Sequence, residues 1–238
     1  MKKCDIVIPL SSESVFDNLE LRFALRSSEK YVQNIGDIYI ITDSPPHWIK
    51  NAKIIYCKDN HSENKDANLI DKLALAASMD EVSEQFIFLS DDQAFLAPFD
   101  CENSKVVYNK RGMSFFANQN NKWRKRMFAT FEFLKKRGIT LEYNFDSHTP
   151  KVYNKKDFLL LEGIDYVTPP GFCINTLLGG LLGLVGEVDQ VEVKAHAEKL
   201  GQEPNFDGKL FAGYNDTGFY YMKKELEKIF YYKSKYEK

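Results

Sequence analysis

The first hundred residues alternate between short apolar runs and longer segments with apolar side chains at helical spacing. Four runs are nearly continuous in apolar residues, as strands buried on both faces are, at positions 5–10, 37–42, 52–57 and 85–90. Between them, residues 18–31 and 66–79 repeat apolar side chains every three or four positions, which is typical of one helix face. This βαββαβ-like order predicts an α/β fold, a mostly parallel sheet with helices on both faces.

The second half of the chain is less regular. Residues 121–137 carry an apolar stripe at helical spacing, and residues 218–236 form a charged, aromatic segment that predicts a last helix. The longest uncharged run, 167–186, contains two prolines and five glycines, so we expect a buried loop and helix there and no transmembrane segment. The pattern predicts a single domain, 1–238, with a regular half at 1–100 and a less regular half at 101–238.

Composition narrows the class of protein. An apolar content of 44% in 238 residues is sufficient for a substantial core, and a net charge of −2 gives no general attraction to nucleic acid. The four cysteines, Cys4, Cys57, Cys101 and Cys173, are scattered without a CxxC pair, so we expect reduced thiols and no zinc site. The apolar stretch at the N-terminus is too short for a signal peptide. These features predict a cytoplasmic protein.

Two adjacent carboxylates, Asp91 and Asp92, end the apolar run at 85–90. Like charges at the end of a buried strand repel one another unless a cation lies between them. Mg²⁺ and Mn²⁺ prefer oxygen ligands and bridge phosphate charge, so the pair is a candidate metal site. An acidic turn after a strand is the alternative, because aspartate is common in turns.

Polar residues follow other predicted strands as well. Residues 11–13 and Asp43 come directly after the first and second runs. In parallel α/β sheets, ligands bind at the carboxyl ends of the strands, near a change in strand order. We therefore expect these residues and the aspartate pair to line one edge.

Several cations are spaced to meet an anion. Arg22 and Arg26 lie four residues apart on a predicted helix, where they can clamp a phosphate or bridge to neighbouring glutamates. Asn68, Asp71 and Lys72 lie near the start of the next helix, where they can meet a pyrophosphate or serve as ordinary capping and pairing residues. A basic cluster at 122–126 is either a solvated helix face or a patch for phosphates.

His148 is the histidine with the strongest claim to a chemical role. It lies two residues after Asp146, between turn signals, and an imidazole beside a carboxylate can act as general base or acid. A structural histidine is the alternative; His47, His61 and His196 have weaker claims. Asp216, after an apolar segment, is either a further metal ligand or part of a turn before the last helix.

The sequence lacks the motifs of several enzyme classes. No GxxxxGK[ST] sequence occurs, which excludes a P-loop kinase or ATPase, and neither a strand-linked GxGxxG nor a GxSxG is present.

Taken in order, these segments resemble the Stealth family, which includes bacterial capsular polysaccharide phosphotransferases and the catalytic part of the lysosomal-enzyme N-acetylglucosamine phosphotransferase. Residues 5–7 resemble the first block of that family, without its tryptophan-containing continuation. Residues 18–30, 38–43 and 86–92 are similar to the second block. Residues 146–150 resemble the third, with its His-x-Pro element, and residues 211–216 the fourth, which ends in Asn-Asp.

The resemblance implies a GT-A-like, Rossmann-like nucleotide-sugar transferase whose first half binds the nucleotide and whose second half binds the sugar and acceptor. It implies Mg²⁺ or Mn²⁺ as cofactor and a nucleotide-sugar and a hydroxyl-bearing glycan as partners. The roles it implies are metal ligands (Asp91, Asp92, Asp216), phosphoryl stabilisers (Arg22, Arg26) and a base (His148). The candidate nucleotide contacts, Asp43, Asn68, Asp71 and Lys72, follow from their places at a strand end and a helix start.

The expected reaction is transfer of a sugar-phosphate to a glycan hydroxyl. Two alternatives remain open. A glycosyltransferase on the same fold moves the sugar itself, and a non-catalytic module binds the sugar nucleotide without turnover.

Overall fold

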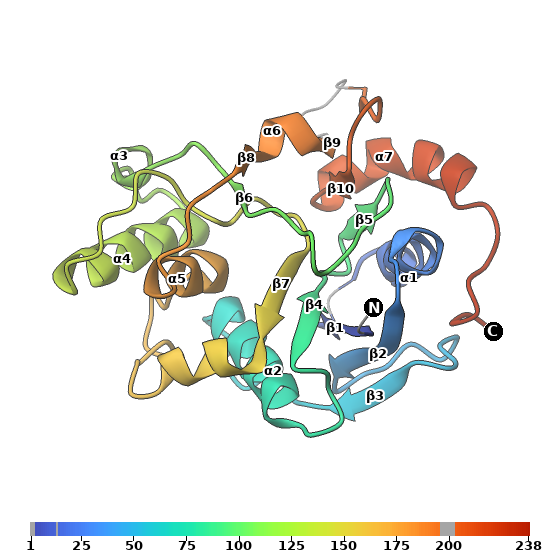
Figure 1. The fold of residues 1–238 in the computed structure, drawn as a ribbon, viewed down its shortest axis with the longest axis horizontal. Helices are drawn as coiled ribbons and strands as arrows, with labels where there is room; N and C mark the ends of the chain where they lie inside the picture. Colours follow the sequence, from blue (N-terminus) through green and yellow to red (C-terminus); the bar gives the residue numbers. More distant parts are fainter. Residues whose placement is uncertain (1–2, 13, 196–202) are drawn as a thin grey trace.

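The computed structural model describes residues 3–12, 14–195 and 203–238. Its centre is a five-stranded sheet in the order β3-β2-β1-β4-β7 (Figure 1). Four strands are parallel, and β7 pairs antiparallel with β4. The strands are β1 (Cys4–Pro9), β2 (Ile35–Thr42), β3 (Lys53–Tyr56), β4 (Gln85–Phe88) and β7 (Lys151–Asn154). The predicted α/β class with a mostly parallel sheet is confirmed.

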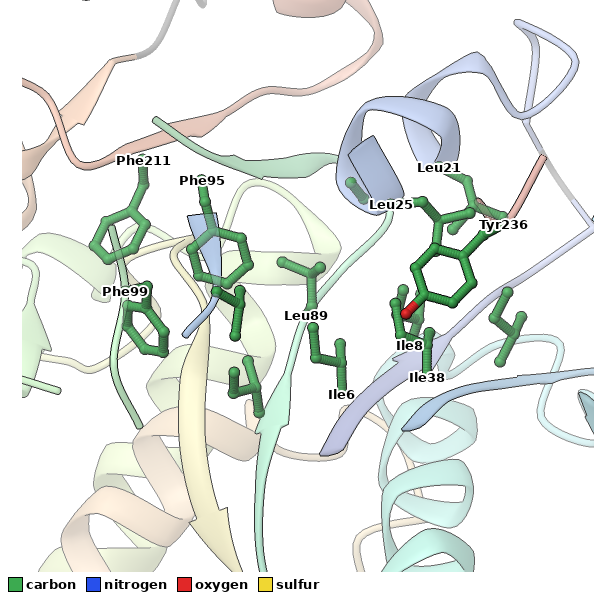
Figure 2. Packing of buried hydrophobic residues seen from close by; sticks show 14 of the residues in the cluster. Ile6, Ile8, Leu21, Leu25, Ile38, Leu89, Phe95, Phe99, Phe211 and Tyr236 are labelled. Atoms are coloured by element: carbon green, nitrogen blue, oxygen red, sulfur yellow. The ribbon is translucent and has the colours of Figure 1, made fainter. Parts of the chain in front are cut away.

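Helices cover both faces of this sheet because side chains alternate along each strand. In β1, Ile6 and Ile8 pack in one apolar cluster with helix α1 (Leu19–Tyr31), whereas Val7 packs on the other face with α2 (Lys65–Ser78). Figure 2 shows Ile6, Ile8 and Ile38 of the sheet beneath Leu21 and Leu25 of α1. Because both faces of the sheet are buried, the strand sequences are apolar at almost every position.

The second half of the chain completes the sheet and adds smaller elements around it. Strand β5 (Gln93–Phe95) pairs with β10 (Phe211–Gly213), which also pairs with β9 (Lys194–Ala195). Strands β6 (Val107–Tyr108) and β8 (Val188–Asp189) form a short parallel pair. Because β5 pairs with β10 and β4 with β7, the halves at 1–100 and 101–238 share their sheets. The remaining helices are α3 (Met113–Phe116), α4 (Lys122–Lys136), η1 (Lys155–Leu161), α5 (Ile174–Leu181), α6 (Gln190–Val193) and α7 (Asp216–Ile229).

The last helix is shorter than its sequence pattern predicts. It ends at Ile229, and the chain then runs back over α1 to reach the loop between β2 and β3. Tyr236 packs into the core beside Leu21 and Leu25 (Figure 2), and Glu237 pairs with Ile49 in an isolated bridge. Burial of this tail, which residue-by-residue periodicity does not reveal, ends the helix before residue 236.

The expectation of four reduced cysteines is wrong for two of them. Cys4, at the start of β1, forms a disulfide with Cys101, which follows β5, while Cys57 and Cys173 are free. The two bonded residues are 97 positions apart, so only the fold brings them together.

Within the described ranges, no helix combines the length and the apolar character that crossing a bilayer requires.

Candidate functional site

Two cavities lie side by side at the carboxyl edge of the parallel strands. The first has a volume of about 290 Å³ and the second about 280 Å³, and Leu69 of α2 lines both. They lie near the point where the strand order changes direction. From β1, the chain continues to β2 and β3 on one side of the sheet, and β4 lies on the other side. This is the position at which α/β sheets bind ligands.

The first cavity is formed by the end of β1, the loop after β3 and the start of α2. Most of its lining side chains are polar or charged: Ser11, Ser12, Asp59, His61, Ser62, Lys65, Asn68 and Lys72. Lys65 opens this 14-residue helix, whose N-terminal end makes the wall suitable for an anion, and Lys72 lies two turns further along it.

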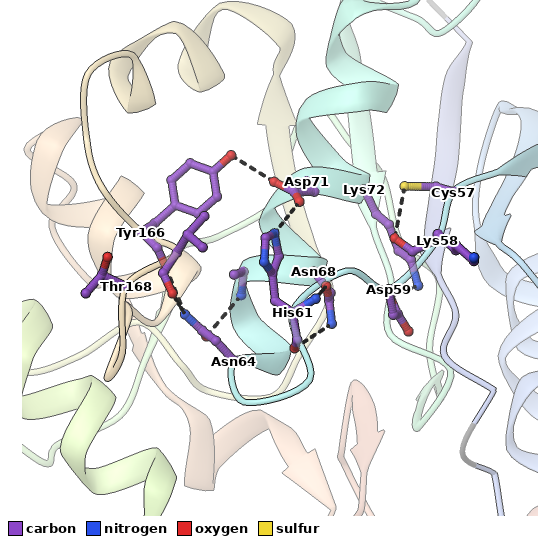
Figure 3. A network of polar contacts seen from close by, with 12 residues as sticks. Cys57, Lys58, Asp59, His61, Asn64, Asn68, Asp71, Lys72, Tyr166 and Thr168 are labelled. Atoms are coloured by element: carbon purple, nitrogen blue, oxygen red, sulfur yellow. Dashed lines mark hydrogen bonds and ion pairs between the residues drawn. The ribbon is translucent and has the colours of Figure 1, made fainter.

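Hydrogen bonds hold the loop beside this cavity in place (Figure 3). The Asn68 side chain accepts from the backbone N–H of His61 and donates to its carbonyl, at 2.9 and 3.1 Å. Nε2 of His61 lies 2.9 Å from Oδ2 of Asp71, whose Oδ1 accepts from the Tyr166 hydroxyl at 2.9 Å. Asn68 and Asp71 therefore position His61, which itself lines the cavity, and Asp71 is not among the lining residues.

Lys72 is buried against the end of β1. Its Nζ lies 2.8 Å from the carbonyl oxygen of Leu10 and 2.6 Å from Oδ1 of Asp59. The lysine thus ties three elements together at the floor of the first cavity. Asp43 lies after β2 on the same edge, is exposed, and is not among the residues that line this cavity.

The second cavity lies between the end of β4, the loop before β7 and strand β9. Its lining is mainly polar: Ser90, Asp92, Gln93, Asn109, Arg111, Asp146, His148, Asn175, Gln190 and Lys194, with Leu69, Phe88 and Trp123 as the apolar part. A pocket with an aromatic side chain and convergent polar groups is typical of small-molecule binding.

His148 and Asp92 meet in the second cavity. Nε2 of His148 lies 2.9 Å from Oδ1 of Asp92, and about a third of each side chain is exposed. His148 has a φ of 53°, in the left-handed region that few side chains adopt. Such strained backbone persists where the surroundings impose it, often at functional positions, and costs on the order of 1 kcal/mol or more. The pair is arranged as a base and the carboxylate that orients it.

The predicted metal ligands belong to one acidic neighbourhood. Burial, together with the nearby charges of Asp92 and Glu20, raises the pKa of Asp91 to about 8. Burial also raises the pKa of Glu20, with Asp216 and Asp92 adding to the effect. Asp216 reaches this place because β10 pairs antiparallel with β5, with Gly213 opposite Gln93. The neighbouring Tyr214 is buried, and its hydroxyl has no hydrogen-bond partner in the described part of the chain.

The carboxylates of Asp91, Asp92 and Asp216 do not form a compact metal centre in this structure. Across the described ranges, no group of three or more His, Cys, Asp or Glu side chains is gathered closely enough to hold a metal ion. The oxygen donors and the crowded negative charge of Asp91, Asp92 and Asp216 nevertheless suit a hard divalent cation in chemical type.

Arg22 and Arg26 do not face the aspartates, in contrast to the expectation that they clamp a phosphate. Nε and Nη2 of Arg26 each lie 2.7 Å from a carboxylate oxygen of Glu237, and Nη1 of Arg22 lies 2.9 Å from the same carboxylate. The Arg22 guanidinium also stacks on Trp48, 3.9 Å from the ring centroid. Both arginines therefore anchor the C-terminal tail, and neither is among the residues lining the two cavities.

The basic cluster at the start of α4 is partly neutralised. Arg126 forms an ion pair with Asp66, and Nζ of Lys122 lies 2.9 Å from Oε2 of Glu63. These pairs join α4 to the start of α2. The Lys122 pair is exposed, as expected of a solvated helix face, whereas Arg126 is largely buried against Asp66.

Sequence reasoning missed several residues that line the cavities, namely Asp59, Lys65, Asn109, Arg111, Asn175 and Lys194, and it underrated His61. Most of them lie in loops or short elements without a periodic signal, and Lys65 lies at the very start of α2. Glu13, at the end of the first predicted strand, and His196 lie outside the described residues.

No protein-family model matches this chain, and a search of curated proteins also finds no significant match.

Proposed function

We propose that this protein is a metal-dependent transferase that uses a nucleotide-diphosphate sugar and transfers its sugar-phosphate to a hydroxyl of a glycan acceptor. The observation that carries the proposal is the His148–Asp92 pair, 2.9 Å apart, in a polar cavity that adjoins a cationic one at the switch point of a parallel sheet. The arrangement offers a base beside an anion-binding pocket. The order of the Stealth-like segments, and the GT-A-like fold that it implies, supports the choice of donor.

The first cavity would take the nucleotide. Lys65 lines it at the start of α2, where the helix dipole attracts an anion, and Lys72, paired with Asp59, fixes its floor. Asn68 and Asp71 act indirectly, by holding the His61 loop against the cavity.

The second cavity would take the sugar and the acceptor. An acceptor hydroxyl attacks the phosphorus next to the sugar, so a new O–P bond forms and the bond to the nucleoside monophosphate breaks. His148 takes the hydroxyl proton at Nδ1, while Asp92, which meets Nε2, orients the ring and stabilises the positive charge.

Asp91, Asp92 and Asp216 would hold Mg²⁺ or Mn²⁺. When bound, the ion supplies charge neutralisation for the diphosphate. This role fits the raised pKa of Asp91, since that carboxyl is buried among other acids and a cation favours its charged form.

The experiment is to incubate the protein with Mn²⁺ or Mg²⁺, a panel of nucleotide-sugars and hydroxyl acceptors, and to identify the released nucleotide. Nucleoside monophosphate supports sugar-phosphate transfer. Nucleoside diphosphate instead assigns a glycosyltransferase. Binding without release assigns a recognition module. Asp92→Asn and His148→Gln serve as inactive controls.

A further inference from the structure

Two cations line the second cavity in addition to the His148–Asp92 pair. Arg111 follows β6, and Lys194 lies in the short strand β9, so both come from the irregular second half of the chain. They take on importance because Arg22 and Arg26 are held by Glu237 and are not available to a substrate.

Arg111 is fixed through its backbone, while its side chain has no acidic partner. Its N–H donates to Oδ1 of Asn109 at 3.1 Å, and its carbonyl accepts from Nδ2 of Asn144 at 2.6 Å. The guanidinium lies 4.7 Å from the centroid of the Phe115 ring and forms no ion pair with any described residue. A stacked, unpaired guanidinium at a cavity wall is well suited to a phosphate, whose oxygens match its planar set of donors.

Lys194 and His148 both pack near Gly213. Only 5% of Lys194 is exposed. A Cβ atom added to Gly213 would lie 3.1 Å from Cδ of Lys194 and 3.6 Å from Cδ2 of the His148 ring, so both side chains pack on the same glycine. The pairing of β9 with β10 creates this contact. The lysine therefore contributes a cation to the cavity that also holds the candidate base.

The acids of the same cavity have other partners. Asp92 meets His148, and Asp146 accepts hydrogen bonds from Thr176 and, at 3.3 Å, from Asn175. Burial lowers the pKa of Lys151 to about 7; the carboxylate of Asp146 opposes that shift, and Lys194 adds to it.

We propose that Arg111 and Lys194 form a phosphate-binding subsite in the second cavity, next to His148. The phosphate belongs either to the donor or to a phosphate-bearing acceptor; this assignment rests on the proposed function, but anion binding does not. The subsite takes the role that the sequence assigns to Arg22 and Arg26, neutralising charge on a phosphoryl group within reach of the base.

Histidine NMR tests the subsite directly, because the chain has four histidines and two of them report on different cavities. The protein is labelled at the histidine rings, the signals are assigned with His148→Gln and His61→Gln, and inorganic phosphate is titrated. We expect a saturable shift of the His148 signal. In Arg111→Gln the dissociation constant read from that signal should rise about tenfold, as loss of a charged hydrogen bond predicts.

The matched control is Arg137→Gln. Arg137 is also exposed and stacks on an aromatic ring, 4.4 Å from the Phe133 centroid, but it is not among the residues lining either cavity. It should leave the titration unchanged. An His148 signal that does not respond to phosphate, or an Arg111→Gln curve that superimposes on the wild-type curve, overturns the proposal. Lys194→Met is a second variant, and Arg111→Gln alone decides the matter if that protein does not fold.

Steady-state kinetics then identify the source of the phosphate. A higher KM for the nucleotide-sugar in Arg111→Gln assigns the subsite to the donor. A higher KM only for a phosphorylated acceptor assigns it to the acceptor. If Arg111→Gln changes neither KM, the subsite takes no part in the reaction. If the protein shows no transferase activity, the proposed function is wrong. The phosphate titration followed by the His148 signal still decides whether the subsite exists.

Discussion

Nε2 of His148 lies 2.9 Å from Oδ1 of Asp92, although one residue precedes β7 and the other follows β4. The antiparallel pairing of these two strands, with Phe88 opposite Lys151, brings their ends together at the carboxyl edge of the sheet. The contact therefore depends on strand β7, the only strand of the central sheet that runs against the others in the described structure.

Replacing either partner should abolish most turnover with little effect on stability. We expect His148→Gln and Asp92→Asn each to lower kcat by roughly 10²- to 10⁴-fold, the usual contribution of a general base. Both side chains are partly exposed, so the melting temperature should change little. The double variant should lose hardly more than the single ones, because the residues act as a unit. Fully additive losses would show that they act separately.

Divalent metal binding should depend on the paired aspartates. Mn²⁺ binding, followed by electron paramagnetic resonance, should weaken at least tenfold in Asp91→Asn and in Asp92→Asn, as removal of one charged ligand predicts. Asp80→Asn, at an exposed aspartate before β4, is the control. Equal affinities in all four proteins would rule out these carboxylates as ligands.

The contacts of Glu237 with Arg22 and Arg26, here called the tail clamp, should make the stability of the protein depend on pH in the acid range. Burial alone would raise the pKa of Glu237, but hydrogen bonds from Arg26, the Ser234 amide and Arg22 outweigh it and lower the pKa to about 2. A lowered carboxyl pKa stabilises the fold above the ordinary value of 4.5, and that stabilisation is lost as the pH falls from 4.5 toward 2.

Glu237→Gln should remove this pH dependence and destabilise the protein at pH 7 by about 3 kcal/mol, since it leaves two arginines without their partner. Urea unfolding at several pH values measures both effects. Glu227→Gln, which removes an exposed pair with Lys223, should cost at most about 1 kcal/mol. If both variants behave alike, the clamp does not stabilise the tail.

The disulfide should be detectable by thiol labelling of the denatured, unreduced protein. We expect two reactive thiols, Cys57 and Cys173, and four after reduction. The double variant Cys4→Ala/Cys101→Ala should lose about 2–4 kcal/mol of stability, because the bond closes a long loop in the unfolded chain. Four thiols before reduction would contradict the pairing.

Gly213→Ala should disturb the second cavity. A Cβ at this position would lie 2.5 Å from the backbone oxygen of His148 and 3.1 Å from Cδ of Lys194, so the strand or the histidine loop must shift. We expect turnover to fall by at least tenfold, as small misplacements of a catalytic group commonly cause. Activity equal to wild type in Gly213→Ala would show that the loop adapts freely.

Local pattern was sufficient to determine the central architecture of this protein. Continuous apolar runs separated by helical periodicity indicate buried parallel strands, because both faces of such a sheet must be covered. The same pattern indicates where each strand ends, and so it marked Asp91 and Asp92 as residues of the ligand-binding edge before any contact was known.

Only the tertiary structure decided which side chains meet. Arg26 and Glu237 are 211 positions apart, and Cys4 and Cys101 are 97 apart, so neither pairing leaves a trace in local spacing. Lys194 reaches His148 only through the pairing of β9 with β10. Periodicity reports which face of an element is buried, whereas long-range partners depend on the packing of elements that are distant in the chain. For this reason the sequence predicted Arg22 and Arg26 at the site, whereas the fold brings Arg111 and Lys194 to the second cavity.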